Sequence, residues 1–135
     1  MNRKEWIAQL KEKTSDAAAE STFASLKKSP GRRPSQQKVE LSAWFDQLAE
    51  QDKHRVAQVI KEAAEQATFN FLYVLDERGD ADSTRADGHL ELRYFRDSQS
   101  ILINDPEDEP LHDIYNWLSQ NTSGGQSEDL SNGEA

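Results

Sequence analysis

The feature that most constrains the fold of this chain is a long helical spacing of apolar residues near its centre. The i, i+3, i+4, i+7 spacing of an amphipathic helix is followed by Leu41, Trp44, Phe45 and Leu48. The same period continues through residues 56–67 and then through TFNFLYVL, residues 68–75. A β-strand is the competing interpretation of residues 68–75, because aromatic and β-branched residues are enriched there. The uninterrupted period favours a helix, and we expect its end to be buried on nearly all sides.

A basic helical segment and a linker precede this region. Apolar residues between positions 6 and 10 share one face, so residues 1–28 are predicted to be an amphipathic helical segment. The pattern pauses near Asp16, which is a candidate cap for a second helical piece. SPGRRPSQQ, residues 29–37, cannot continue a helix, because proline lacks the amide donor and disfavours helix before it. We therefore expect an exposed linker at residues 29–37.

The C-terminal half predicts a β-hairpin followed by a short helix. HLELRYF, residues 89–95, alternates with the period of a strand, and SILIN, residues 100–104, is a second apolar run. The RDSQ between them supplies turn residues, which indicates an antiparallel hairpin with a longer turn. Two strands alone are unstable in water, so helices must cover one face of the hairpin. The predicted fold is α+β and mainly helical, with a core domain at residues 38–120 and a disordered tail at residues 121–135.

The charge of the chain changes sign along the sequence. The net charge is -9, yet residues 1–33 carry eight Lys and Arg against four Asp and Glu, a net of +4. Residues 76–120 carry four against twelve, a net of -8. An acidic surface of this kind repels nucleic acid and accelerates association with a basic protein. We therefore predict a basic protein partner and no binding of nucleic acid. We also predict no membrane association, since no apolar run approaches the ~18 residues of a membrane span.

The stretch NDPEDEPLHDIYNWL, residues 104–118, has the chemistry of a helix start. Asp108 or Glu109 is placed to accept the free amides of a first helical turn. Pro110 suits the first helical position, and Asp113 meets the positive end of the helix dipole. These roles account for the acidic residues without any ligand.

An acid–base or metal site is the alternative interpretation of the same region. Asp105, Glu107 and His112 would hold a divalent cation if the loop curled back, although their spacing meets no metal-binding rule. Asp76 follows an apolar run and is the best single candidate for acid–base chemistry, which needs a carboxyl group in apolar surroundings. We favour the helix start and predict no catalytic residue, no cofactor and no metal.

Trp117 is the candidate anchor of a protein interface. A place in the core is the more common outcome for each of the three tryptophans of the chain. Trp117, however, lies off the apolar stripe of the last helix and beside acidic residues, where interface tryptophans are common. The predicted protein-binding residues are therefore Glu107, Asp108, Glu109, Asp113 and Trp117.

These features favour a small acidic interaction protein without catalysis, such as an immunity or antitoxin-like neutraliser of a basic partner. The absence of cysteine excludes disulfides, thiol catalysis and Cys-based zinc sites. The first residues lack the apolar core of a secretory signal, so we expect a cytoplasmic protein. The alternatives are a metal-dependent or acid–base enzyme near His112, and an assembly protein whose basic residues 1–33 dock on an acidic neighbour.

Overall fold

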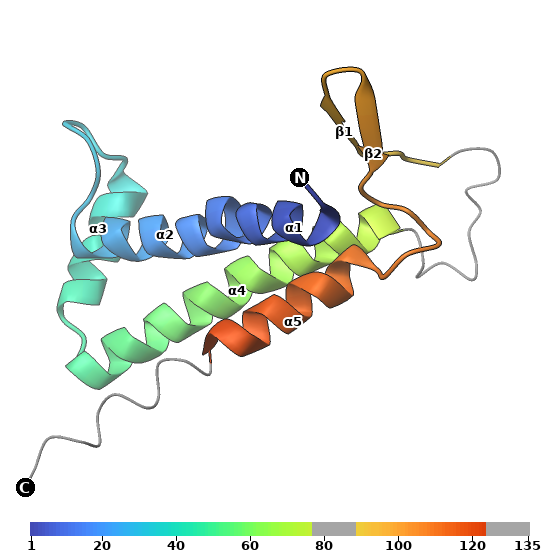
Figure 1. Ribbon diagram of the computed structural model, residues 1–135. Coiled ribbons are helices and arrows are strands. Elements are labelled where there is room, and N and C mark those ends of the chain that lie inside the picture. The colour runs from blue at the N-terminus through green and yellow to red at the C-terminus, as the bar shows by residue number, and fades with distance from the viewer. Residues whose placement is uncertain (77–88, 124–135) are drawn as a thin grey trace, which may run out of the picture. The chain divides into compact units, whose positions relative to one another are not determined.

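The computed structural model describes residues 1–76 and 89–123 (Figure 1). The elements follow in the order α1 (Arg3–Lys11), the π-helix η1 (Glu12–Asp16), α2 (Ala17–Lys27), α3 (Gln36–Asp46), α4 (Glu50–Asp76), β1 (Arg93–Arg96), β2 (Gln99–Leu102) and α5 (Leu111–Ser123). The described chain is thus mainly helical with one two-stranded antiparallel sheet and a short final helix, which confirms the predicted α+β class. Among its helices, none combines the length and low charge content of a membrane span.

The chain divides into two compact units. One unit holds Met1–Gln9 and Phe69–Ala135, and the other holds Leu10–Thr68. The predicted linker at residues 29–37 lies within the second unit, and the ranges predicted as separate domains stay predictions. Helix α5 runs through Ser123, past the predicted start of the tail, and the rest of that tail lies outside the described residues.

In the second unit, the helix does not stop where the sequence pauses. The backbone stays helical through Glu12–Asp16 and widens into a π-helix. Asp16 makes no capping hydrogen bond, and its carboxylate instead accepts two bonds from Lys11 Nζ at 2.7 and 3.0 Å. The predicted cap at Asp16 is therefore wrong, because a charged partner one turn earlier takes both carboxylate oxygens.

Helices α2 and α3 pack through a small aromatic contact. The rings of Phe23 and Phe45 meet edge to face with centroids 5.5 Å apart, and Phe45 is buried. The Ser42 hydroxyl donates to the carbonyl of Leu26 at 2.9 Å and joins the same two helices. The residues between the helices are irregular and include Gly31 with a φ of 81°, a value that favours glycine. Ser35 is the N-cap of helix α3, and its side chain accepts the Lys38 amide.

Replacing Ser35 with alanine is expected to lower the free energy of unfolding by about 1 kcal/mol, because the Lys38 amide loses its acceptor. Chemical denaturation of the variant and the parent protein measures the difference. Gln37→Ala, at an exposed position in the first turn of the same helix, is the control and is expected to change stability by less than about 0.5 kcal/mol. Equal effects at the two positions would show that the cap contributes nothing.

Helix α4 confirms the helical interpretation of residues 68–75 but corrects their expected burial. Leu72 and Asp76 are buried, whereas Phe71 is 55 % exposed and Val74 is 46 % exposed. Residues four apart lie on the same face of a helix, so Leu72 and Asp76 mark the inner face. The prediction of burial on nearly all sides is therefore wrong, because a second apolar stripe of α4 faces outward.

The hairpin of the first unit is tighter than predicted. Arg96 pairs with Gln99, so the turn contains only Asp97 and Ser98. Asp97 has a φ of 55°, a conformation that Asp tolerates better than most residues and that suits the twist of a two-residue hairpin. Phe95 is 71 % exposed. The core of this unit consists of Ile7, Leu72, Ile103, Leu111, Ile114 and Tyr115.

Candidate functional site

Asn104 holds together three backbone segments of the first unit. Its side-chain nitrogen donates to the carbonyls of Leu75 at 2.9 Å and Leu90 at 2.8 Å. Its side-chain oxygen accepts the Leu92 amide at 2.8 Å. Asn104 is only 7 % exposed, so these bonds replace water at buried polar groups. The end of α4 is thereby joined to the residues that flank the hairpin, a role that sequence reasoning missed.

Asp76, at the end of α4, caps helix α5. Its Oδ1 accepts the Leu111 amide at 2.9 Å and its Oδ2 accepts the His112 amide at 3.0 Å. These are the first two amides of α5, which have no partner within the helix. The sequence assigned the capping role to Asp108 or Glu109, and that assignment is wrong for these amides. Asp108 instead accepts the amide of Glu109 at 2.7 Å, before the helix begins.

The same carboxylate orients the ring of His112. Nδ1 of His112 lies 2.5 Å from Asp76 Oδ2, and Nε2 lies 3.5 Å from Asp113 Oδ1. An ionised carboxylate only accepts, so with Asp76 ionised the ring donates to it through Nδ1. The rings of Phe69 and Tyr73 meet the imidazole edge-on, with centroids 5.4 and 5.0 Å away. His112 is thus fixed by one buried acid and two aromatic rings.

The candidate cation ligands of the sequence do not converge in the described residues. Asp105 Oδ1 accepts the Glu107 amide at 3.0 Å in a local turn, while His112 turns toward Asp76. Within residues 1–76 and 89–123, no group of three or more His, Asp or Glu side chains is placed to hold a metal ion. The chemistry that the structure brings together is therefore the Asp76–His112 pair.

A groove of about 610 Å³ lies against Asp76. Its walls combine apolar and charged groups, from Leu75, Asp76, His89, Leu90, Glu91, Leu102, Asn104 and Pro106. A side-chain hydrogen bond from Arg93, together with the positive charge of Arg93, lowers the pKa of Glu91 below its ordinary value. A lowered pKa means that this contact stabilises the fold above the ordinary pKa of glutamate, and that the effect is lost as the pH falls through the lowered value. His112 is not among the residues that line this groove.

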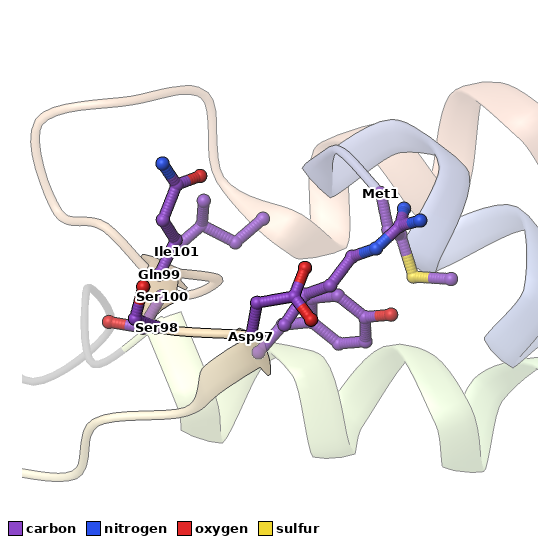
Figure 2. Close-up of a pocket in the computed structure, with 8 residues that line it drawn as sticks. Met1, Asp97, Ser98, Gln99, Ser100 and Ile101 are labelled. Atoms are coloured by element: carbon purple, nitrogen blue, oxygen red, sulfur yellow. The ribbon is translucent and has the colours of Figure 1, made fainter.

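A second groove, of about 500 Å³, lies beside the turn of the hairpin. Figure 2 shows Met1 on one side of it and Gln99 and Ile101 on the other. Arg96 and Asp97 place opposite charges on its wall. Charges of both signs around an open groove select no single class of ligand.

Arg3 binds part of the acidic stretch within the same unit. Its guanidinium donates to the carbonyls of Ile103 at 2.7 Å and Glu109 at 2.6 Å. Nη1 of Arg3 also lies 3.4 Å from Asp108 Oδ2. The charge of Asp108 is therefore compensated inside the chain. This contact was not foreseen, because one arginine among eight basic residues of the N-terminal region carries no distinguishing signal.

The remaining predicted protein-binding residues lie at the surface. Glu107 and Glu109 are exposed, and the side chain of Asp113 is 58 % exposed. Trp117 is 63 % exposed and Trp44 is 50 % exposed. These two tryptophans are therefore not buried, although burial is the more common outcome for tryptophan. The outer face of α5 carries Asp113, Asn116, Trp117, Gln120 and Asn121. Trp117 is the one large apolar side chain on that polar face.

A groove of about 260 Å³ lies beside Trp117. It is lined by Lys4, Glu109, Ile114, Trp117 and Leu118. Ile114 is buried, Leu118 is half-buried and Trp117 is exposed, so the floor is apolar and the charged residues lie at its edge. Two of the predicted protein-binding residues, Glu109 and Trp117, therefore meet at one concave surface. Comparison of this chain with protein families, with curated proteins and with solved structures finds no match.

Proposed function

We propose that this chain is a small acidic interaction protein without catalysis, which binds a basic protein partner through the start and outer face of α5. The observation that carries the proposal is Trp117, 63 % exposed on a polar helix face and one turn after Asp113. Exposed tryptophan is uncommon on free surfaces and frequent among the residues that dominate binding energy. The form that we favour is an immunity or antitoxin-like protein, whose acidic face covers the basic site of its partner.

The acidic residues suit this role because several of them face solvent. Glu107, Glu109 and Asp113 are exposed, and helix α5 itself contains neither lysine nor arginine. A cluster of one sign attracts an oppositely charged partner over a Debye length of about 10 Å at 0.1 M salt. Asp108 contributes less to this attraction, because Arg3 compensates its charge.

Reversing Glu107 and Asp113 to lysine is expected to slow association with the partner by about tenfold or more at low salt, because steering by opposite charges is lost. The partner is first captured on the immobilised chain from an extract of the cells that encode it, and its association rate is then measured at low and high salt. High salt is expected to bring the parent and variant rates together. Folding stability should fall by about 1 kcal/mol or less for each exposed charge.

The matched control reverses Glu20 and Glu62, which are exposed on α2 and α4. This variant has the same net charge as the test variant, so it separates the position of the charges from their sum. Its association rate is expected to stay within about threefold of the parent rate. Equal slowing by the two variants, or a rate indifferent to salt, would contradict binding through the α5 surface.

The Asp76–His112 contact favours acid–base chemistry as a second candidate function. A carboxylate that orients a histidine through Nδ1 is a recurrent arrangement in catalysis. Both oxygens of Asp76, however, also accept amides of α5, so helix capping already accounts for the carboxylate. A metal-dependent form of this candidate expects divalent cations to raise the melting temperature of the parent chain and not that of His112→Gln.

An assembly role remains the third proposal, with the basic N-terminal region docking on an acidic neighbour. Arg3 illustrates the chemistry that such docking would use, since it pairs with Asp108 and with two carbonyls of its own unit. The self-association of the chain, measured by sedimentation at low and high salt, tests this proposal.

A further inference from the structure

The groove beside Trp117 is smaller than the usual pocket for a whole small molecule. Its volume is about 260 Å³, and pockets that hold whole small molecules usually enclose about 300–1,000 Å³. Ile114 and Leu118 supply apolar groups at the floor, and the indole of Trp117 forms an exposed wall. A leucine-sized apolar group in this groove would cover groups that otherwise face water.

The charges at the edge of the groove favour a basic neighbour for that apolar group. Glu109 lines the groove, and Asp113 lies one turn before Trp117 on the same face of α5. Lys4 lines the groove as well and offsets the charge of Glu109, so the exposed Asp113 beside the groove supplies the excess negative charge. A lysine or arginine of the partner would therefore lie over Asp113 and Trp117 and away from Lys4. The exposed indole adds an attraction for a cation placed over its face.

We infer that this groove receives one leucine-like side chain of a protein partner, next to a lysine or arginine that pairs with Asp113 and Glu109 and contacts the Trp117 ring. This inference rests on the proposed function and names the chemistry that the partner must present. Charge complementarity selects a partner segment of this kind over an acidic segment such as residues 126–135, which carries three acidic residues and no basic one.

Three blocked pentapeptides test the inference against the full chain by NMR. The first has one leucine between lysines, the second replaces the leucine with serine, and the third replaces the lysines with glutamates. The readouts are the indole N–H signal of Trp117 and the methyl signals of Ile114 and Leu118. The leucine–lysine peptide is expected to shift all three and to bind roughly tenfold tighter than the serine peptide, because it buries one leucine. It should bind a few-fold tighter than the glutamate peptide, a difference that salt removes.

Two variants of matched chemistry complete the experiment. Trp117→Gln is expected to weaken binding of the leucine–lysine peptide by roughly tenfold, because the wall of the groove is lost. Trp44→Gln removes a tryptophan of similar exposure from α3 and is expected to leave the affinity unchanged. An affinity that survives Trp117→Gln, or a leucine–lysine peptide that leaves the three signals in place, would overturn the inference.

The remaining outcomes separate this inference from the proposed function. Equal binding of the leucine and serine peptides at the α5 face would show that the groove does not receive the leucine. The inference would then fail, while the proposed acidic binding surface would stand. Tighter binding of the glutamate peptide would overturn both. Signals that shift with protein concentration alone would assign the groove to a second copy of the chain, and signals that shift on Leu130→Ser would assign it to the C-terminal residues. Either result would overturn the inference.

Discussion

Replacing Leu72 with alanine is expected to lower the free energy of unfolding by about 2–5 kcal/mol, the usual cost of a cavity in a packed core. Leu72 is completely buried in α4, in the same unit as Ile103, Leu111 and Tyr115. The measurement is urea denaturation of the variant and the parent chain, with the midpoint and the slope compared separately. An unchanged slope attributes the loss to stability and not to a change in the unfolded state.

Phe71→Ala is the matched control for this prediction. Phe71 directly precedes Leu72 in the same helix and is 55 % exposed. Its replacement by alanine removes a larger side chain than the replacement of Leu72 does. Its replacement is expected to cost less than about 1 kcal/mol, because most of its surface already faces water. A loss at Phe71 that equals the loss at Leu72 would mean that the outer stripe of α4 is covered in solution.

Replacing Asp76 with alanine is expected to cost about 3–5 kcal/mol, because a buried charged partner and the acceptor of two helix amides are removed together. The variant leaves the amides of Leu111 and His112 without their acceptor, and the half-buried ring of His112 without its carboxylate. Hydrogen exchange should locate the effect. Relative to the parent chain, exchange should accelerate more at the first amides of α5 than at the amides of α2 and α3.

Asp113→Ala provides the control, since it removes an exposed acid from the first turn of the same helix. It is expected to cost about 1 kcal/mol or less. A double-mutant cycle that combines Asp76→Asn with His112→Asn should give a coupling energy of at least about 0.5 kcal/mol between the two side chains. Additive effects would instead assign the whole role of Asp76 to capping.

The sequence predicted correctly those elements whose signal is local. The helical period through residues 68–75 and the apolar spacing of α5 each depend on neighbours within a turn. The hairpin also forms, although β1 covers only Arg93–Arg96 and not the whole of the predicted residues 89–95. The proline-rich stretch ended one helix as predicted, but the next helix begins at Gln36, inside the range predicted as a linker, because Ser35 caps it. Of the five predicted protein-binding residues, Glu109 and Trp117 line one groove, and their role in binding stays a prediction. Trp117 was recognisable because it lies off a periodic stripe.

The burial of α4 shows where a periodic pattern stops being informative. Two apolar stripes run along this helix near its end, and only the one containing Leu72 faces the core. Both stripes have helical spacing, so the choice depends on which neighbouring segments pack against the helix. That information is absent from the spacing itself.

The long-range polar contacts were decided by the tertiary structure alone. Asp76 caps α5 from 35 residues away, Asn104 joins three segments and Arg3 reaches the acidic stretch from the other end of the chain. Asp76 and Asn104 satisfy buried polar groups, and Arg3 pairs with an exposed carboxylate. Only folding brings these partners within reach. By itself, the sequence determined the helix and strand periods, the direction of the charge gradient and the off-stripe position of Trp117, since these are properties of neighbouring residues. The tertiary structure decided which carboxylate caps which helix and which apolar face is buried. Both choices depend on the free energy of burying polar groups together with their partners, and those partners are distant in the chain.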